Sequence, residues 1–286
     1  MTNFVGTKQA ATDIRRTILV TGASGGIGRA TALAVADQCD RMIIHGNRRV
    51  EELNSLAKEL KDRGIAVDIL KYDLSMEFEQ NNLIESVLRR HHENDRLVAT
   101  IYAAGVDLMA LDERDRTGDE KLKQILAVDV GATARIARRL GLFMKGQTDY
   151  YSSRMGEKTS TPVCIFFGWS GIDRGMPGET AELYALAKGA VTAFSKSLAQ
   201  SLAPSVRCVT VAPGWIRTAW GQQASPDFQR LATDDSLAGR WGTPDDVAKV
   251  VRFLLSEDSH FINADVIPVT GGYRSRSVKK RAKALW

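Results

Sequence analysis

The sequence predicts an α/β protein built on one parallel sheet with helices on both faces. Two observations predict this class. Short apolar runs alternate with amphipathic stretches of helical period from residue 17 to residue 270, the pattern of repeated strand–helix units around a sheet that is buried on both faces. No linker rich in Pro, Gly or Ser interrupts the alternation, so one domain is expected. Right-handed crossovers then make the sheet doubly wound.

Seven apolar runs have the length and composition of buried strands. They are residues 17–21, 41–45, 67–72, 97–103, 162–168, 207–212 and 265–269. Helical patterns lie between them at residues 27–37, 51–63, 83–91, 181–202 and 245–255. Residues 144–161 are polar and show no period, which predicts a surface loop. Residues 217–240 form a longer segment of the kind that covers ligands in such domains.

The composition is that of an ordinary globular protein. Of 286 residues, 44% are hydrophobic and 26% are charged, which excludes disordered and fibrous classes. The formal charge is +5, but residues 273–286 carry six basic and no acidic side chains, so the rest of the chain is close to neutral. Net charge therefore gives no reason to expect nucleic acid or a membrane as a partner of the folded body. The basic tail either contacts an acidic carrier protein, a membrane surface or nucleic acid, or is solvated or packed between subunits.

Three widely spaced cysteines, Cys39, Cys164 and Cys208, fit neither a disulfide framework nor a zinc site and predict buried thiols in a reducing compartment. His91 and His92 lie at the end of a helical pattern and His45 and His260 stand alone, so no metal site is expected. No run of 18 apolar residues occurs, and residues 1–16 contain no apolar stretch of the kind that a secretory signal needs. A cytoplasmic protein is expected.

Glycines follow the first predicted strand directly. Gly22, Gly26 and Gly28 stand between that strand and a helical pattern. Glycines at this point let the backbone turn sharply and approach a phosphate, while the helix N-terminus offers free N–H groups and the positive end of its dipole. The position of the cluster predicts a dinucleotide-binding turn. A tight turn without a ligand is the alternative.

The end of the second predicted strand indicates which dinucleotide is bound. A ribose with a free 2′-hydroxyl is usually held there by an acid, and a 2′-phosphate by a base. The sequence reads Asn47-Arg48-Arg49 without a carboxylate, and Arg48, or Arg49 in its place, can pair with a phosphate. This favours NADP(H) over NAD(H); an exposed basic loop is the alternative. Asp73, after the third strand, either accepts from an adenine amino group or caps a helix.

Tyr184 and Lys188 stand four residues apart in a helical pattern, which sets the phenol and the ammonium group on one helix face. A lysine cation beside a phenol stabilises the phenolate and lowers the tyrosine pKa from about 10 toward the operating pH. Tyr184 would then be a usable general acid and base. The alternative is a core tyrosine beside a solvated lysine.

In order and spacing, these motifs resemble the short-chain dehydrogenase/reductase family over residues 16–272, and they look most like its 3-oxoacyl-carrier-protein reductase type. The resemblance includes Ser170 after the fifth strand and three later segments, Pro213-Gly214-Trp215-Ile216-Arg217-Thr218, Arg240-Trp241-Gly242-Thr243-Pro244 and Gly271-Gly272. It implies a Rossmann-type, doubly wound, seven-stranded parallel sheet flanked by helices in a single domain, residues 17–272. Residues 1–16 are then an N-terminal extension, and a homotetramer or homodimer is expected.

The resemblance also implies roles for individual residues. Tyr184 would donate a proton to a carbonyl, Lys188 would lower the tyrosine pKa and hold the nicotinamide ribose, and Ser170 would hydrogen-bond the carbonyl oxygen. Asp129 stands where the family has a catalytic helix asparagine. The residues expected to line the cofactor are Gly22, Ser24, Ile27, Gly28, Asn47, Arg48, Asp73, Leu74, Gly105, Tyr184, Lys188, Pro213, Gly214, Ile216 and Thr218.

Three positions depart from the family pattern. Tyr102-Ala103 replaces two asparagine-type positions, so two bracing side chains are absent. Asp129 can accept a hydrogen bond in a proton relay but adds a negative charge near Lys188; the alternative is a structural helix residue. Ser170 lies 14 residues before Tyr184, one more than the family spacing, and Gly171 occupies the expected place. A one-residue bulge after Ser170 would restore the register.

The sequence therefore predicts an NADPH-dependent oxidoreductase that interconverts a carbonyl and a secondary alcohol by hydride transfer. Its substrate would be a small molecule or an acyl thioester, with a 3-oxoacyl thioester as the family candidate. The alternative is a cofactor-binding regulatory protein or pseudoenzyme on the same scaffold. The altered Asp129 and Tyr102 positions favour that alternative, and the presence of Ser170, Tyr184 and Lys188 argues against it.

Overall fold

The computed structural model describes residues 14–91, 95–108, 116–155 and 160–274. All predicted catalytic and cofactor residues lie within these ranges. Residues 1–13 of the predicted N-terminal extension and residues 275–286 of the basic tail lie outside them.

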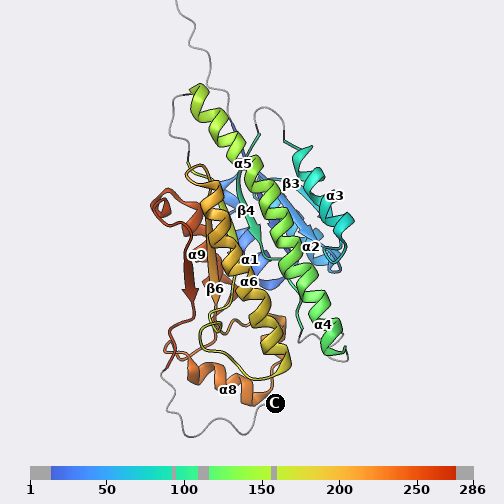
Figure 1. The fold of residues 1–286 in the computed structure, drawn as a ribbon, viewed down its shortest axis with the longest axis vertical. Helices are drawn as coiled ribbons and strands as arrows, with labels where there is room; N and C mark the ends of the chain where they lie inside the picture. Colours follow the sequence, from blue (N-terminus) through green and yellow to red (C-terminus); the bar gives the residue numbers. More distant parts are fainter. Residues whose placement is uncertain (1–13, 92–94, 109–115, 156–159, 275–286) are drawn as a thin grey trace, which may run out of the picture.

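Seven parallel strands form one sheet in the order β3-β2-β1-β4-β5-β6-β7 (Figure 1). Their bounds are β1 Arg15–Thr21, β2 Arg41–Gly46, β3 Ala66–Lys71, β4 Asp95–Tyr102, β5 Val163–Phe167, β6 Arg207–Pro213 and β7 Val266–Val269. The chain proceeds outward from β1 to β3, then returns to the other side of β1 and continues from β4 to β7. The doubly wound sheet predicted from the sequence is thus confirmed, with its order reversing between β1 and β4.

Helices connect these strands. They are α1 Gly26–Ala34, α2 Val50–Asp62, α3 Glu77–Leu88, α4 Gly118–Ile125, α5 Thr133–Met155, α6 Glu179–Leu202, α7 Ala219–Gln223, α8 Pro226–Asp235 and α9 Pro244–Leu255. Short 3₁₀ turns occupy η1 Ala36–Gln38 and η3 Glu257–Ser259, and a π-helical segment, η2 Leu126–Ala132, joins α4 to α5. Thr117 and Thr243 begin α4 and α9 with capping boxes, which satisfy backbone N–H groups at the helix starts.

A hydrophobic core lies on each face of the sheet. Successive strand residues point to opposite faces, so Ile18 and Val20 of β1 belong to the core beside α1, α2 and α9, while Leu19 belongs to the core beside α3, α5 and α6. Figure 1 shows α5 and α6 crossing in front of the sheet. Each such fully buried aliphatic side chain stabilises the fold by about 1.5–3 kcal/mol, and together the cores hold the carboxyl ends of the strands at one edge.

The prediction of a surface loop at residues 144–161 is wrong for residues 144–155. These residues form the last turns of α5. Met144, Thr148 and Tyr151 are buried at helical spacing. Arg96 of β4 donates to the Thr148 hydroxyl at 3.3 Å and lies over the Tyr151 ring, 6.0 Å from its centroid. Because only one of these three side chains is fully apolar, an apolar period does not reveal the helix.

Two further expectations concern the surface and the thiols. All three cysteines are buried and free, as predicted. In the part of the chain that the structure describes, none of the helices is long and apolar enough to cross a membrane.

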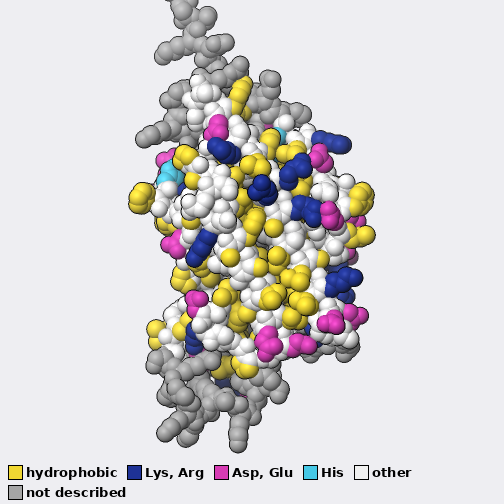
Figure 2. Space-filling model, in the orientation of Figure 1, with side chains coloured by type: hydrophobic (Ala, Val, Ile, Leu, Met, Phe, Trp, Pro, Cys, Tyr) yellow, Lys and Arg dark blue, Asp and Glu magenta, His cyan; other side chains and the backbone are white. Residues whose placement is uncertain are grey.

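Figure 2 shows the face that carries α5 and α6. Hydrophobic side chains gather over the middle and lower half of this face, and Lys and Arg side chains are more frequent above.

Candidate active site

A large cavity opens at the carboxyl edge of the sheet. Its volume is about 740 Å³, and segments that follow each of the strands from β1 to β6 contribute to its lining. The cavity therefore spans the point where the strand order reverses between β1 and β4. Doubly wound sheets bind nucleotides in this crevice.

Gly22 and Gly28 shape the first turn of the cavity. Gly22 has a φ of +67°, and a Cβ atom there would lie 2.5 Å from the carbonyl oxygen of Ala103. A Cβ atom on Gly28 would lie 2.2 Å from the carbonyl oxygen of Gly22. Both positions therefore require glycine. The turn brings the start of α1 to the cavity, where helix N–H groups and the helix dipole favour a phosphate.

Asn47 and Arg48, which follow β2, lie in the same wall as Asp73, which follows β3. Burial raises the pKa of Asp73, but hydrogen bonds from Ser75 and Asn47 and the charge of Arg48 outweigh it, so this pKa lies below its ordinary value. Asp73 is therefore an ionised acceptor.

These walls have the chemistry to hold a dinucleotide. The glycine turn at the start of α1 would hold the pyrophosphate, Arg48 and Arg49 a ribose phosphate, and Asp73 the adenine amino group.

His45 is a structural member of this wall. It is 2% exposed, and its Nε2 lies 3.0 Å from the carbonyl oxygen of Tyr72, to which it donates. Burial lowers the pKa of His45 to about 4. The imidazole is therefore neutral at physiological pH and links the end of β2 to the segment after β3.

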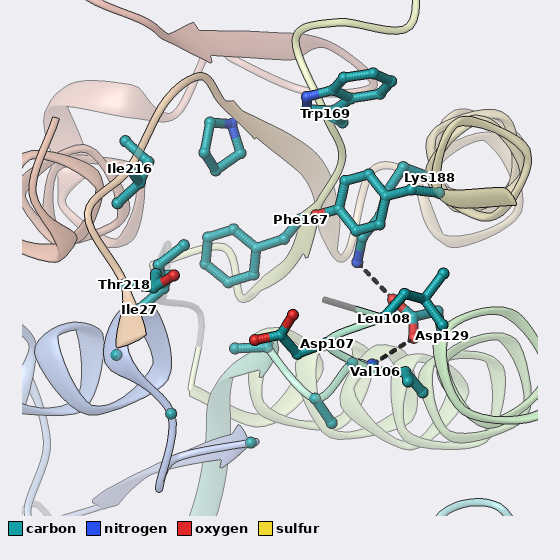
Figure 3. Close-up of a pocket in the computed structure, with 18 of the residues that line it drawn as sticks. Ile27, Val106, Asp107, Leu108, Asp129, Phe167, Trp169, Lys188, Ile216 and Thr218 are labelled. Carbon is teal, nitrogen blue, oxygen red and sulfur yellow. Dashed lines mark hydrogen bonds and ion pairs between the residues drawn. The ribbon is translucent and has the colours of Figure 1, made fainter. Parts of the chain in front are cut away.

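Asp129 and Lys188 form a buried ion pair in the cavity (Figure 3). The Lys188 Nζ atom lies 2.8 Å from Asp129 Oδ1, and the backbone N–H of Val106 donates to Asp129 Oδ2 at 2.8 Å. Asp129 lies in η2, a type of helical segment that often occurs at functional sites. Gly105 leaves room for the carboxylate, since a Cβ atom there would lie 2.9 Å from Oδ1. Contacts from α6 and from the segment after β4 thus fix the carboxylate.

Tyr184 lies one helical turn before Lys188 on α6, with the lysine Nζ 5.4 Å from the phenol ring centroid. Burial raises the pKa of Tyr184, Lys188 lowers it, and Asp129 and Asp107 raise it again, so this pKa lies above its ordinary value. The sequence-based expectation of a lowered tyrosine pKa is wrong because burial of the phenol, together with the charges of Asp129 and Asp107, outweighs the lysine charge.

Lys188 remains charged although it is buried. Burial lowers the pKa of Lys188, but the charges of Asp129 and Tyr184 and the hydrogen bond to Asp129 raise it well above its ordinary value. At neutral pH Tyr184 is therefore a phenol and Lys188 an ammonium ion.

Ser170 lies in a different environment from the one predicted. Its hydroxyl donates to the carbonyl oxygen of Pro213 at 2.9 Å and accepts from the Tyr273 hydroxyl at 2.5 Å. Among the described residues, its neighbours Trp169 and Gly171 line the cavity, but Ser170 does not. The Trp169 ring packs edge to face against Tyr184, with centroids 5.6 Å apart. The indole of Trp169 therefore packs against the phenol, whereas the serine hydroxyl is bonded to Pro213 and Tyr273.

Five aromatic side chains define one part of the cavity lining, which we call the aromatic end: Trp169, Tyr184, Trp215, Phe228 and Tyr273. Trp215 packs edge to face against Phe228 at 6.2 Å between centroids. These residues come from the loops after β5 and β6, from α6 and α8, and from the last described residues. Apart from Tyr184, none of these residues was predicted from the sequence as a site residue.

Asp235 and Arg174 hold the aromatic end together. Asp235 is 3% exposed and accepts from Trp215 Nε1 at 3.2 Å and from Arg174 at 3.4 Å. The Arg174 guanidinium lies 4.0 Å from the centroid of the Tyr273 ring, a cation–π contact. The network thus joins segments that are far apart in the sequence.

The C-terminal segment is anchored beside α8. The N–H groups of Leu237 and Ala238 each donate at 3.0 Å, to the carbonyl oxygens of Gly272 and Gly271, and the N–H of Arg274 donates to the Asp235 carbonyl oxygen at 2.9 Å. Tyr273, the first residue of the predicted tail, is therefore paired with the folded body.

The structure places nearly all predicted site residues together. All fifteen residues expected to contact the cofactor line the cavity, and so does Asp129. Tyr102, by contrast, is buried in the core and stacks on Phe166 with centroids 5.0 Å apart. Within the described ranges, no group of three His, Cys, Asp or Glu side chains is arranged to hold a metal ion.

Comparisons with known proteins agree with this geometry. Residues 22–274 match a family model described as Enoyl-(Acyl carrier protein) reductase. The uncharacterized oxidoreductase YmfI of Bacillus subtilis is 28% identical over 91% of this chain and 99% of its own length. The 3-oxoacyl-[acyl-carrier-protein] reductase FabG of Thermotoga maritima is 29% identical over 89% of this chain and 96% of its own length.

A solved structure from Beutenbergia cavernae, which contains NADP at low occupancy, is 25% identical to this chain and superposes with a TM-score of 0.74, covering 90% of this chain and 96% of that one. The match to the family model extends over most of the sequence and includes the glycine turn, Tyr184 and Lys188. The chain belongs to the short-chain dehydrogenase/reductase family of NAD(P)-dependent oxidoreductases.

Proposed function

We propose that this protein uses NADPH to reduce a carbonyl to a secondary alcohol, with Tyr184 as the acid that protonates the carbonyl oxygen. The observation that carries the proposal is the cluster of Tyr184, Lys188 and Asp129, which lines the cavity at the carboxyl edge of the sheet. The same cavity contains the walls that fit the dinucleotide.

The reduced nicotinamide, when bound, supplies the hydride that forms the new C–H bond. Tyr184 supplies the proton: its O–H bond breaks as the substrate oxygen takes the proton, and the Lys188 cation stabilises the phenolate that remains. Water then returns a proton to the phenolate. Because the pKa of Tyr184 lies above its ordinary value, the side chain is in the acid form at neutral pH, as reduction requires.

The preference for NADPH over NADH rests on Arg48 and Arg49, which follow β2 and line the cavity. A guanidinium group can make paired, charge-assisted hydrogen bonds to a 2′-phosphate. Titration of both dinucleotides, followed by protein fluorescence, measures the preference. Absence of NADPH binding at millimolar concentration would refute the cofactor assignment.

The proposed class of substrates is the 3-oxoacyl thioesters. The name of the Thermotoga maritima relative supports this proposal. Oxidation of NADPH at 340 nm in the presence of 3-oxoacyl thioesters, simple ketones and keto sugars tests it. Turnover of ketones without turnover of any thioester would remove the thioester from the proposal and leave carbonyl reduction in place.

The second candidate function is a cofactor-binding regulatory protein without turnover. Ser170 favours it, because its hydroxyl is engaged by Pro213 and Tyr273 and does not line the cavity among the described residues. Tight NADPH binding with no oxidation across the whole carbonyl panel would support this candidate over the enzyme.

A homodimer or homotetramer in the cytoplasm completes the proposal. Leu142 and Tyr150 of α5 and Leu186 of α6 are about half-exposed, and hydrophobic side chains gather on the face that carries these helices (Figure 2). Such side chains are suited to contact between subunits. Light scattering of the purified protein tests this, and a monomer at micromolar concentration would contradict it.

A further inference from the structure

The aromatic end presents flat rings in the cavity lining, and one of them packs against the proposed proton donor. Tyr184 is the proton donor in the proposed reaction, so the group attached to the carbonyl carbon lies among its neighbours. Trp169 is the ring in direct contact with Tyr184, at 5.6 Å between centroids. Trp215 and Phe228 form a second edge-to-face pair in the same lining. Aromatic rings prefer offset and edge-to-face contacts with other rings.

The orientation of Trp169 is fixed by its own loop. A Cβ atom on Gly171 would lie 2.3 Å from an atom of the Trp169 six-membered ring, so the indole packs directly over the Gly171 backbone. The hydroxyl of the intervening Ser170 is held by Pro213 and Tyr273. The loop therefore keeps the indole at the cavity wall instead of a hydroxyl group.

The basic side chains at the aromatic end are paired with buried carboxylates. Of the basic side chains in the described lining there, Arg174 pairs with buried Asp235 at 3.4 Å and Lys188 pairs with buried Asp129 at 2.8 Å. A substrate carboxylate or phosphate would have to compete with a buried carboxylate for either cation, at a large desolvation cost. This end of the cavity therefore suits an uncharged group.

We propose that the aromatic end binds an uncharged aryl group directly attached to the reacting carbonyl, with Trp169 as the main surface against which that aryl ring packs. The ketone can be free or part of a 3-oxoacyl thioester. This inference rests on the proposed carbonyl reduction. It restricts the proposed substrates to carbonyls with an attached aryl group, on the evidence of the loop that holds Trp169.

The experiment compares two uncharged ketones of similar apolar size, 2-acetylnaphthalene and 2-decanone, and one anionic ketone, 2-oxobutyrate. In the native protein with NADPH, kcat/KM should be highest for 2-acetylnaphthalene, by about tenfold or more over the other two. Trp169→Ala should lower kcat/KM for 2-acetylnaphthalene about tenfold with a small change for 2-decanone. Trp169→Phe, which keeps a ring, should restore most of the preference.

Trp241→Phe is the matched control. Trp241 packs behind Trp215, with centroids 5.9 Å apart, but is not among the described residues that line the cavity. This variant should keep the native ratio between the two uncharged ketones. Circular dichroism and thermal melting establish that each variant is folded. If Trp169→Ala melts early, the native ratio and the Trp169→Phe ratio still decide the question.

A binding measurement separates this inference from the proposed function. Calorimetry should detect 2-acetylnaphthalene binding to the native protein and weaker binding to Trp169→Ala, whether or not turnover occurs. Equal losses for both uncharged ketones in Trp169→Ala, or a preference for 2-oxobutyrate, would overturn the inference. Binding without turnover of any ketone would instead overturn the reductase and leave the aromatic site standing.

Discussion

The carboxylate of Asp129 lies 2.8 Å from the ammonium group of Lys188 in the cavity lining. The pair is buried, and Val106 donates a backbone hydrogen bond to its second oxygen. Burial raises the pKa of Tyr184, and the charge of Asp129 offsets part of the lowering that Lys188 causes.

Asp129→Asn should move the pH profile of the reductase to lower pH. Reduction requires protonated Tyr184, so activity is lost as pH rises through its pKa; removing the Asp129 charge removes one cause that raises this pKa. The groups that act on the phenol are Lys188, Asp129 and Asp107. The profile of kcat/KM between pH 6 and 11 measures the shift. An unchanged basic limb would show that Asp129 does not act on Tyr184.

Tyr184→Phe should lower kcat by roughly 10²- to 10⁴-fold, the usual contribution of a general acid. The phenol makes up a small part of the cavity lining, so NADPH affinity should stay within about threefold of the native value. Stopped-flow reduction and fluorescence titration measure the two quantities separately. Activity retained within tenfold would refute the assigned proton donor.

Arg48→Ala should weaken NADPH binding and leave NADH binding unchanged. A charge-assisted hydrogen bond contributes about 1.5–3 kcal/mol, which corresponds to a roughly 10- to 100-fold increase in the NADPH Kd. Arg49→Ala, the adjacent change, is the comparison and should have the smaller effect. Equal weakening of both dinucleotides by Arg48→Ala would argue against a 2′-phosphate contact.

His45 should make the fold less stable in acid. Its pKa falls from 6.5 unfolded to about 4 folded because of burial, so the unfolded chain binds a proton that the folded chain does not. The contribution of His45 to the free energy of unfolding is therefore complete above pH 6.5. It is lost as the pH falls from 6.5 to 4, by about 3 kcal/mol in total. Urea unfolding at pH 7.5 and 4.5 should show a smaller pH effect in His45→Gln. His260→Gln, at an exposed position, should behave like the native protein.

The sequence was sufficient for those parts of the site that local spacing determines. The glycine turn, the Tyr184 and Lys188 pair, and the strand ends at Arg48 and Asp73 each lie within one short segment whose geometry follows from helix or strand period. Their meeting in one cavity follows from the parallel sheet, whose carboxyl ends share an edge.

The aromatic end could not be predicted in this way. Arg174, Asp235 and Tyr273 come from three segments whose mutual placement depends on tertiary packing. The family spacing suggested a bulge that would bring the Ser170 hydroxyl to the catalytic position, whereas the indole of Trp169 occupies the cavity wall and Ser170 turns to Tyr273. Local spacing gives no information about which of two adjacent loop residues faces a cavity.

The pairing of Gly272 with Leu237 places Tyr273 in the cavity lining at the very end of the described chain. A ribosome therefore makes the nucleotide walls, at Gly22 and Arg48, long before it makes the last aromatic ring. A chain cut directly before Tyr273, by premature termination or proteolysis, would keep all the strands that form those walls and lose one ring of the aromatic end. In a population of such chains, the proposed cofactor binding would be retained while the proposed aryl binding is weakened, so the ratio of the two would report how many molecules keep Tyr273.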